Sequence, residues 1–214
     1  QRHLQFIYHS IQCMNVQLKS AHREVVVFYA EAKEVFSYLT EHYIIDSVFS
    51  DQESGVRATW DRDKEVGRLL KEKRIEWHEF QRDGIVRGIK NRDAWDKQWY
   101  AHVYEPIIQN GYTPQEVDFT NPFPLPSTLQ EDWSAYPENF QRPGERFAWK
   151  YLTSFCEERG KDYRSKISKP LESRKSCSRI SPYLAWGNVS IKQAYQFVKQ
   201  HPNATNHKRS FNGF

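Results

Sequence analysis

The sequence has little cysteine, and its cysteines form no recognisable framework. Of its 214 residues three are cysteines, Cys13, Cys156 and Cys177. They are odd in number, far apart and without a CxxC pair, which favours reduced thiols in a reducing, cytoplasmic compartment over disulfides. The eight histidines show no HExxH or other paired-ligand spacing. We therefore expect no metal site.

Long apolar runs and glycine-rich phosphate loops are also lacking. No stretch approaches the roughly 20 apolar residues of a membrane helix, so we expect no membrane partner, and no signal peptide opens the chain. Neither GxGxxG nor GxxxxGK[ST] occurs, which excludes the common nucleotide-binding loops. The first residues lack an initiator Met and run directly into a helical pattern, so we expect the chain to be part of a longer protein.

The chain is rich in aromatic side chains and carries a mild positive charge. Aromatics make up 15% of the residues and the net charge is +4. Aromatic rings fill cores and also serve as stacking platforms, and the charge permits a polyanionic partner without requiring one. A basic cluster after residue 80 either steers a phosphate polymer or is a solvated surface. It comprises Arg82, Arg87, Lys90, Arg92 and Lys97.

The first 80 residues alternate between helical and strand patterns. The spacing of apolar residues predicts three amphipathic helices, and short β-branched or alternating runs predict three strands. The helices are expected over residues 3–19, 31–43 and 59–73, and the strands over residues 24–30, 47–50 and 75–80. Because strands that alternate with helices pair in parallel, we predict an incomplete, Rossmann-like parallel α/β domain over residues 1–105. Its first strand would precede Gln1.

Proline becomes frequent after residue 105. Prolines recur from Pro106 to Pro143 and exclude helix interiors. The segment is not rich in Gly and Ser, as a flexible tether would be. We predict an ordered connector over residues 106–142.

From residue 143 the pattern is helical, which predicts an all-α region over residues 143–214. Gly160 is the predicted stop of a helix over residues 144–158. Ser181 and Ser190 are predicted N-caps, the first followed by proline. The tail over residues 201–214 is predicted to be irregular.

The segment from Ser176 to Ser190 carries the most chemistry. It gathers serine hydroxyls, the Arg179 guanidinium and free backbone N–H groups at a predicted helix start. Helix N-termini bind anions through their unpaired donors, and a guanidinium suits a phosphate or a carboxylate. The residues alone leave two interpretations open: a phosphate site, or a capped helix with a structural salt bridge.

Residues 178–187, SRISPYLAWG, resemble the signature helix of the DNA photolyase/cryptochrome family, [T/S]-S-R-[L/I]-S-P-Y-L-x-x-G. Several shorter segments resemble other parts of that family. They are Arg62-Asp63, Gly144-Glu145, Lys169-Pro170 and Gly187-Asn188-Val189-Ser190-Ile191. The resemblance covers nearly the whole chain in order. It implies an α/β antenna domain, a long connector and the first helices of an α-helical FAD-binding domain, both domains being incomplete.

The resemblance also implies a set of cofactor-binding residues. Ser178 and Ser181, with the amides near Ile180, would hold the phosphates of FAD. Arg179 would support this loop or reach a phosphate or a nearby acid. Tyr163 would contact the phosphate or ribose region. Cys177 stands where the family usually has threonine, and a thiol is a poorer donor than a hydroxyl.

No catalytic residue is assigned from the sequence. In the family, the helix that lines the flavin and the tryptophan electron-transfer chain lie beyond the equivalent of Phe214. A second, antenna chromophore of folate or deazaflavin type is compatible with the resemblance. Glu53 and Asp63 would either neighbour it or act as cap and surface residues.

Two functions follow from the resemblance. One is a deoxyribodipyrimidine photolyase, a carbon–carbon lyase that uses FAD and light to repair pyrimidine dimers in UV-damaged DNA. The alternative is a cryptochrome-like blue-light photoreceptor without repair activity. The full-length protein is expected to be monomeric, and the 214-residue chain by itself is expected neither to retain FAD nor to repair DNA.

Overall fold

The computed structural model describes residues 1–114 and 119–214 and divides them into two compact units. The described part of the sheet unit is residues 26–99 and 119–129, and that of the helical unit is residues 1–25, 100–114 and 130–214. These units follow packing in three dimensions and join segments from both sides of residue 105. The domain boundaries at 105 and 142 therefore stay a prediction.

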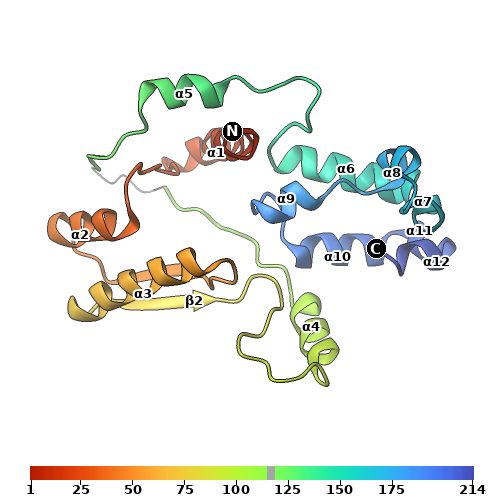
Figure 1. Cartoon of the computed structure of the whole chain (residues 1–214), viewed down its shortest axis with the longest axis horizontal. Helices are drawn as coiled ribbons and strands as arrows, with labels where there is room; N and C mark the ends of the chain where they lie inside the picture. Colours follow the sequence, from red (N-terminus) through yellow and green to blue (C-terminus); the bar gives the residue numbers. More distant parts are fainter. Residues whose placement is uncertain (115–118) are drawn as a thin grey trace. The chain divides into compact units, whose positions relative to one another are not determined.

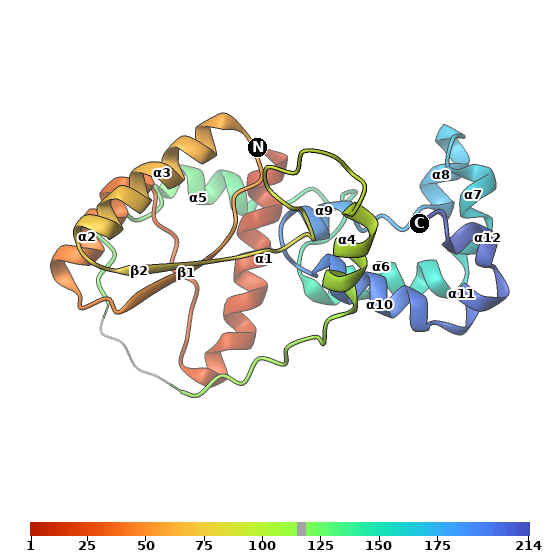
Figure 2. The same ribbon diagram turned by 90° about the horizontal axis from the view of Figure 1, so that it is seen from below.

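The sheet unit contains a parallel strand pair with its crossover helix (Figures 1 and 2). Its elements are α2 (Ala32–His42), β1 (Ser47–Asp51), α3 (Arg57–Glu72) and β2 (Glu76–Phe80). The pairing runs in register from Ser47 opposite Glu76 to Asp51 opposite Phe80. The side chains of Val35 on α2, and of Val66 and Leu70 on α3, are buried. These two strands and their parallel pairing confirm the sequence prediction.

The predicted strand over residues 24–30 is wrong. Within the described residues this segment is extended but joins no ladder. Its backbone bonds instead to isolated groups: Tyr29 N donates to Phe123 O at 2.8 Å, and Val27 O accepts from Asn121 Nδ2 at 2.9 Å. Phe123 lies between two prolines, and because proline has no N–H donor such a segment cannot continue a ladder.

The helical unit is built mainly from short helices around one core. The elements of this unit are α1 (Arg2–Leu18), η1 (Lys19–Ala21), α6 (Glu145–Glu157), η2 (Arg159–Asp162), α7 (Tyr163–Lys166), α8 (Pro170–Ser176), α9 (Ser181–Ala185), α10 (Ile191–Gln200), α11 (Pro202–Asn206) and α12 (Lys208–Phe211). Two further helices, α4 (Trp95–Tyr104) and α5 (Ser127–Ser134), each have residues in both units. In the region that the structure describes, none of the helices has the length and apolar character to cross a membrane.

The core of the helical unit joins segments that are far apart in the sequence. Helices α6 and α10 lie side by side (Figures 1 and 2). The core residues are Phe6, Ala148, Leu152, Phe155, Cys156, Ile180, Tyr183, Val189, Ala194, Val198 and Phe211. Tyr183 is fully buried and its hydroxyl donates to Arg142 O at 2.7 Å. Burial of these side chains provides most of the driving force for the packing.

Three local predictions in this unit are corrected. Gly160 is not a left-handed helix stop, because α6 ends at Glu157 and Gly160 lies in η2, where an added Cβ would be 2.8 Å from Phe155 O. The tail is not irregular, since residues 202–211 form α11 and α12, broken only at residue 207. The N-cap of α9 is Ile180 rather than Ser181, because the Ile180 carbonyl already accepts from Tyr183 N and Leu184 N. The predicted N-cap at Ser190 is confirmed.

Candidate cofactor sites

The loop over residues 177–181, hereafter the phosphate loop, joins α8 to α9. Arg179 has a φ of 63°, in the left-handed region, and Ile180 follows with right-handed φ −83° and ψ −16°. Successive residues of opposite hand turn consecutive N–H groups toward one side and make an anion-binding concavity. Ser178 Oγ accepts the Ile180 N–H at 3.4 Å. Within the described residues the N–H groups of Arg179 and Ser181 have no acceptor, so they are available to a ligand.

Arg179 is held by an amide rather than by an acid. Its Nε and Nη2 each lie 3.3 Å from Gln141 Oε1, and Gln141 Nε2 donates to Arg179 O at 2.7 Å. No carboxylate of the described chain pairs with it. The structural salt bridge that the sequence left open is therefore not found in the described part of the chain, where no acid compensates the positive charge of Arg179.

The two serines of the loop differ in exposure. Ser178 is 8% exposed, whereas Ser181 is exposed and makes no capping bond. Cys177 ends α8, and its N–H donates to Ser173 O at 2.9 Å. Ser181 is thus the hydroxyl of the loop that is most accessible to a ligand.

Tyr163, the first residue of α7, lies at the edge of the core near Cys177. Its ring packs edge-on against Phe155 at 5.8 Å and against Phe214 at 6.2 Å. Partial burial, and then the neighbouring Cys177, raise the pKa of Tyr163 above its ordinary value. Its hydroxyl makes no hydrogen bond to any residue that the structure describes, so it remains a donor for a ligand beside the phosphate loop.

Beside the phosphate loop lies a positively charged cavity of about 700 Å³. Arg2, Arg174, Arg179 and Ser181 line it, together with aromatic rings, and no acidic residue is among the described residues of its lining. The Arg2 guanidinium lies 5.1 Å above the ring of Phe140. Three guanidinium groups without a carboxylate make this cavity favourable for an anionic ligand.

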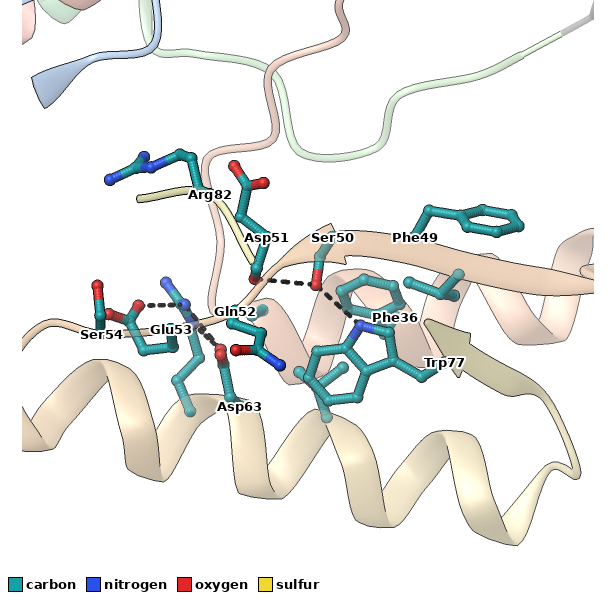
Figure 3. Close-up of a pocket in the computed structure, with 14 residues that line it drawn as sticks. Phe36, Phe49, Ser50, Asp51, Gln52, Glu53, Ser54, Asp63, Trp77 and Arg82 are labelled. Atoms are coloured by element: carbon teal, nitrogen blue, oxygen red, sulfur yellow. Dashed lines mark hydrogen bonds and ion pairs between the residues drawn. The ribbon is translucent and has the colours of Figure 1, made fainter. Parts of the chain in front are cut away.

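A second cavity, of about 470 Å³, lies in the sheet unit where β1 and β2 end (Figure 3). In open α/β sheets the crevice beyond the carboxyl ends of the strands is the usual place for a ligand. Phe36 and Trp77 form its apolar wall, and the Trp77 indole N–H donates to Ser50 Oγ at 2.9 Å. Sequence reasoning named Glu53 and Asp63 as possible neighbours of an antenna chromophore but did not identify the cavity that they line, although the residues that directly follow the two predicted strands would have indicated it.

Carboxylates gather at the mouth of the strand-end cavity. Arg62 Nη2 bridges Glu53 Oε2 at 3.2 Å and Asp63 Oδ1 at 2.7 Å, a junction that Figure 3 marks with dashed lines. The Gly55 backbone N–H first, and then Thr59 and Arg62, hold the pKa of Glu53 below its usual range. Asp51 also lines the cavity, and its carboxylate accepts no hydrogen bond from the described residues. The structure therefore brings Glu53 and Asp63 together through Arg62, whereas the Asp51 carboxylate lies on the other side of the strand, beside Arg82 (Figure 3).

Neither a protein-family model nor a curated protein matches this sequence. Solved structures do match it across almost its whole length. A photolyase of the archaeon Sulfolobus tokodaii, whose crystal structure contains two FAD molecules and implies a novel light-harvesting cofactor, aligns over 98% of this chain with a TM-score of 0.63 and 18% identity. The class III photolyase of Agrobacterium tumefaciens aligns over 96% with a TM-score of 0.68, and the cryptochrome of Synechocystis over 99% with 0.69, both at 16% identity.

This chain has the photolyase/cryptochrome fold. It spans about half of the matched structures, 48%, 45% and 47% of their lengths in the same order. The resemblance seen in the signature helix and the predicted order, α/β followed by all-α, are confirmed for the fold. These neighbours include photolyases and a cryptochrome, so the fold by itself does not distinguish DNA repair from photoreception.

Proposed function

We propose that this chain belongs to a deoxyribodipyrimidine photolyase and holds the two phosphates of FAD at the phosphate loop. The observation that carries the proposal is that, among the described residues, the N–H groups of Arg179 and Ser181 have no acceptor and the neighbouring arginines have no acidic partner. Charge-assisted hydrogen bonds from backbone amides and guanidinium groups are the strong contacts that phosphates select.

The residues named from the sequence have different roles in this proposal. The amides of Arg179 and Ser181, with the Ser181 hydroxyl, would contact phosphate oxygens. Ser178 supports the turn through the Ile180 N–H, and Tyr163 would donate its free hydroxyl to a phosphate or a ribose. The Cys177 side chain remains the weakest member of the set, because a thiol donates poorly.

Bound FAD would supply the photochemistry, in which the reduced, light-excited cofactor gives an electron to a pyrimidine dimer flipped out of UV-damaged DNA. The chain's own part is to hold and orient the dinucleotide and to compensate its charge. In this proposal the protein acts as a lyase in the cytoplasm and as a monomer.

Nuclear magnetic resonance of the ¹⁵N-labelled 214-residue chain tests the phosphate assignment. Titration with inorganic pyrophosphate is expected to shift the amide signals of Arg179, Ile180 and Ser181 saturably, while equal ionic strength of chloride leaves them unchanged. Shifts spread evenly over the surface lysines and arginines, with none at this loop, would rule the assignment out.

A cryptochrome-like photoreceptor is the alternative, and the Synechocystis neighbour favours keeping it. The two functions differ in what a protein that carries this chain and the second half of the fold does under blue light. A photolyase converts dimer-containing DNA into undamaged DNA, as measured by chromatography of the digested strands. A photoreceptor leaves the dimers intact.

The strand-end cavity is our proposed site for a second, antenna chromophore. Its size suits a fused-ring heterocycle, and the Asp51 carboxylate, which lies beside Arg82, can accept hydrogen bonds from a ligand that donates them, as a folate pterin does. Asp51→Asn is expected to weaken binding of reduced folate at least several-fold in a fluorescence titration. Unchanged binding would remove Asp51 from the site.

A further inference from the structure

Behind the phosphate loop lies an arginine that sequence reasoning missed. Arg159, in η2, donates from Nη2 to Tyr151 O at 2.7 Å and to Ser178 O at 3.3 Å, from Nε to Ser154 Oγ at 3.2 Å, and from Nη1 to Cys177 O. Its guanidinium also lies 6.0 Å from the ring centre of Tyr151. It therefore joins the end of α6 directly to the loop.

All four acceptors of Arg159 are neutral. No carboxylate of the described residues forms an ion pair with it, and partial burial lowers its pKa, with a further contribution from the nearby Arg179. Partly buried guanidinium groups are usually paired with an acid, because removing a charge from water is costly. Arg159 and Arg179 together thus place two uncompensated positive charges at one loop.

The position of Arg159 also determines which way the peptide planes of the loop face. In a trans peptide the C=O of one residue and the N–H of the next point in opposite directions. Since the carbonyls of Cys177 and Ser178 both point at Arg159, the N–H groups of Ser178 and Arg179 point away from it. Neither N–H has an acceptor among the described residues.

We propose that Arg159 is the positioning residue of the phosphate loop: it draws two carbonyls inward, turns the opposing amides toward the ligand, and adds a positive charge that a bound diphosphate compensates. This inference deepens the proposed function and rests on it for the identity of the ligand. It names a residue outside the SRISPYLAWG segment, 18 positions from Cys177 in the sequence.

Two substitutions separate the charge of Arg159 from its forked geometry. Arg159→Met removes both, whereas Arg159→Lys keeps the charge, but a single ammonium cannot span acceptors on both α6 and the loop. Arg146→Met is the matched control, because Arg146 is an exposed arginine at the other end of α6. It loses the same charge without contact to the loop.

Pyrophosphate titration followed by NMR gives the affinity, and ¹⁵N relaxation gives the order of the loop. Arg159→Met is expected to weaken pyrophosphate binding by about tenfold, because the loop amides lose their positioning and the ligand loses a nearby positive charge, and to lower the order of residues 178–181. Arg159→Lys is expected to lower that order equally but to lose less affinity. Arg146→Met should change neither.

The outcomes distinguish this inference from the proposed function. If the unmodified chain binds no pyrophosphate, the proposed function fails, while the loop order in Arg159→Met and Arg159→Lys still tests the positioning. Loop order equal to that of the unmodified chain in both variants overturns the inference. Equal loss of affinity in Arg159→Met and Arg146→Met overturns it as well, because the effect would then be one of net charge.

Discussion

At the scale of one residue, burial of the Cys156 side chain determines how reactive its thiol is. Its side chain lies in the core of the helical unit and is 1% exposed, whereas Cys13 is exposed. Burial first, and then the neighbouring Glu157, raise the pKa of the Cys156 thiol from 9.0 to about 12. The thiolate is the reactive form of cysteine, so the two thiols should differ widely in reactivity.

We predict that a thiol reagent at pH 8 modifies Cys13 in the folded chain and leaves Cys156 unmodified until the protein unfolds. Mass spectrometry of peptides from native and urea-unfolded samples measures this. Cys13→Ser is the control and should remove the Cys13 reaction without making Cys156 reactive; any native reaction that remains belongs to Cys177, which is of intermediate exposure. Fast modification of Cys156 under native conditions would contradict the packing described here.

The same raised pKa has a consequence for stability. The folded chain keeps the Cys156 proton at pH values where the unfolded chain releases it. The stability that this group contributes is therefore fully present below about pH 9, the unfolded value, and is lost as the pH rises toward the folded value of about 12. The free energy of unfolding of a Cys156→Ala variant should lack this decline above pH 9.

Helices α9 and α10 follow each other closely, yet their first turns are used differently. Ser190 Oγ accepts from Gln193 N at 3.1 Å and Gln193 Oε1 accepts from Ser190 N at 2.9 Å, a complete capping box. Ser181 lies in the first turn of α9 and makes no such bond. One serine therefore stabilises its helix, whereas the other is free for a ligand.

At the scale of the element, alanine substitutions test whether Ser190 stabilises its helix while Ser181 contacts the ligand. Ser190→Ala is expected to lower the free energy of unfolding by about 1 kcal/mol, the usual value of an N-cap, without affecting pyrophosphate affinity. Ser181→Ala should change stability by less than about 0.5 kcal/mol, as exposed substitutions do, and should weaken pyrophosphate binding. Urea denaturation and titration provide the two measurements. A reversed pattern would mean that Ser181 is structural.

At the scale of the whole molecule, the chain spans about half of the structures that share its fold. The contacts that we assign within it are all to phosphate and ribose. We therefore predict that FAD and ADP-ribose, which share the same diphosphate diester, bind with affinities that agree within about threefold, a difference of well under 1 kcal/mol. Riboflavin, which lacks phosphate, should not bind measurably.

Isothermal titration of the three ligands checks this, and gel filtration in the presence of excess FAD should return a colourless protein. ADP-ribose serves as the control that keeps the adenosine and the diphosphate of FAD but lacks the flavin. A yellow, stoichiometric complex, or FAD binding much more tightly than ADP-ribose, would show that residues of this chain also hold the flavin ring.

Local sequence patterns predicted α1, α2, α3, β1, β2 and the Ser190 cap, because periodicity and capping act over a few residues. The prediction failed for residues 24–30 because the neighbouring proline-rich segment offers one acceptor, Phe123 O, and one donor, Asn121 Nδ2, instead of a ladder. It failed at Gly160 because the reason for a glycine there is the closeness of Phe155, not a left-handed turn. In both cases the competing influence is tertiary and has no local signal.

The sequence by itself determined the alternation of helix and strand over residues 31–80 and the helix start at Ser190, because periodicity and capping depend on contiguous residues. Only the tertiary structure decided what surrounds the phosphate loop. Gln141 meets Arg179 from 38 positions away and Arg159 meets Cys177 from 18, while the strand-end cavity forms where two separate strands end together. Residues so far apart in the sequence meet only because the core packs, and no short segment of the sequence specifies that packing.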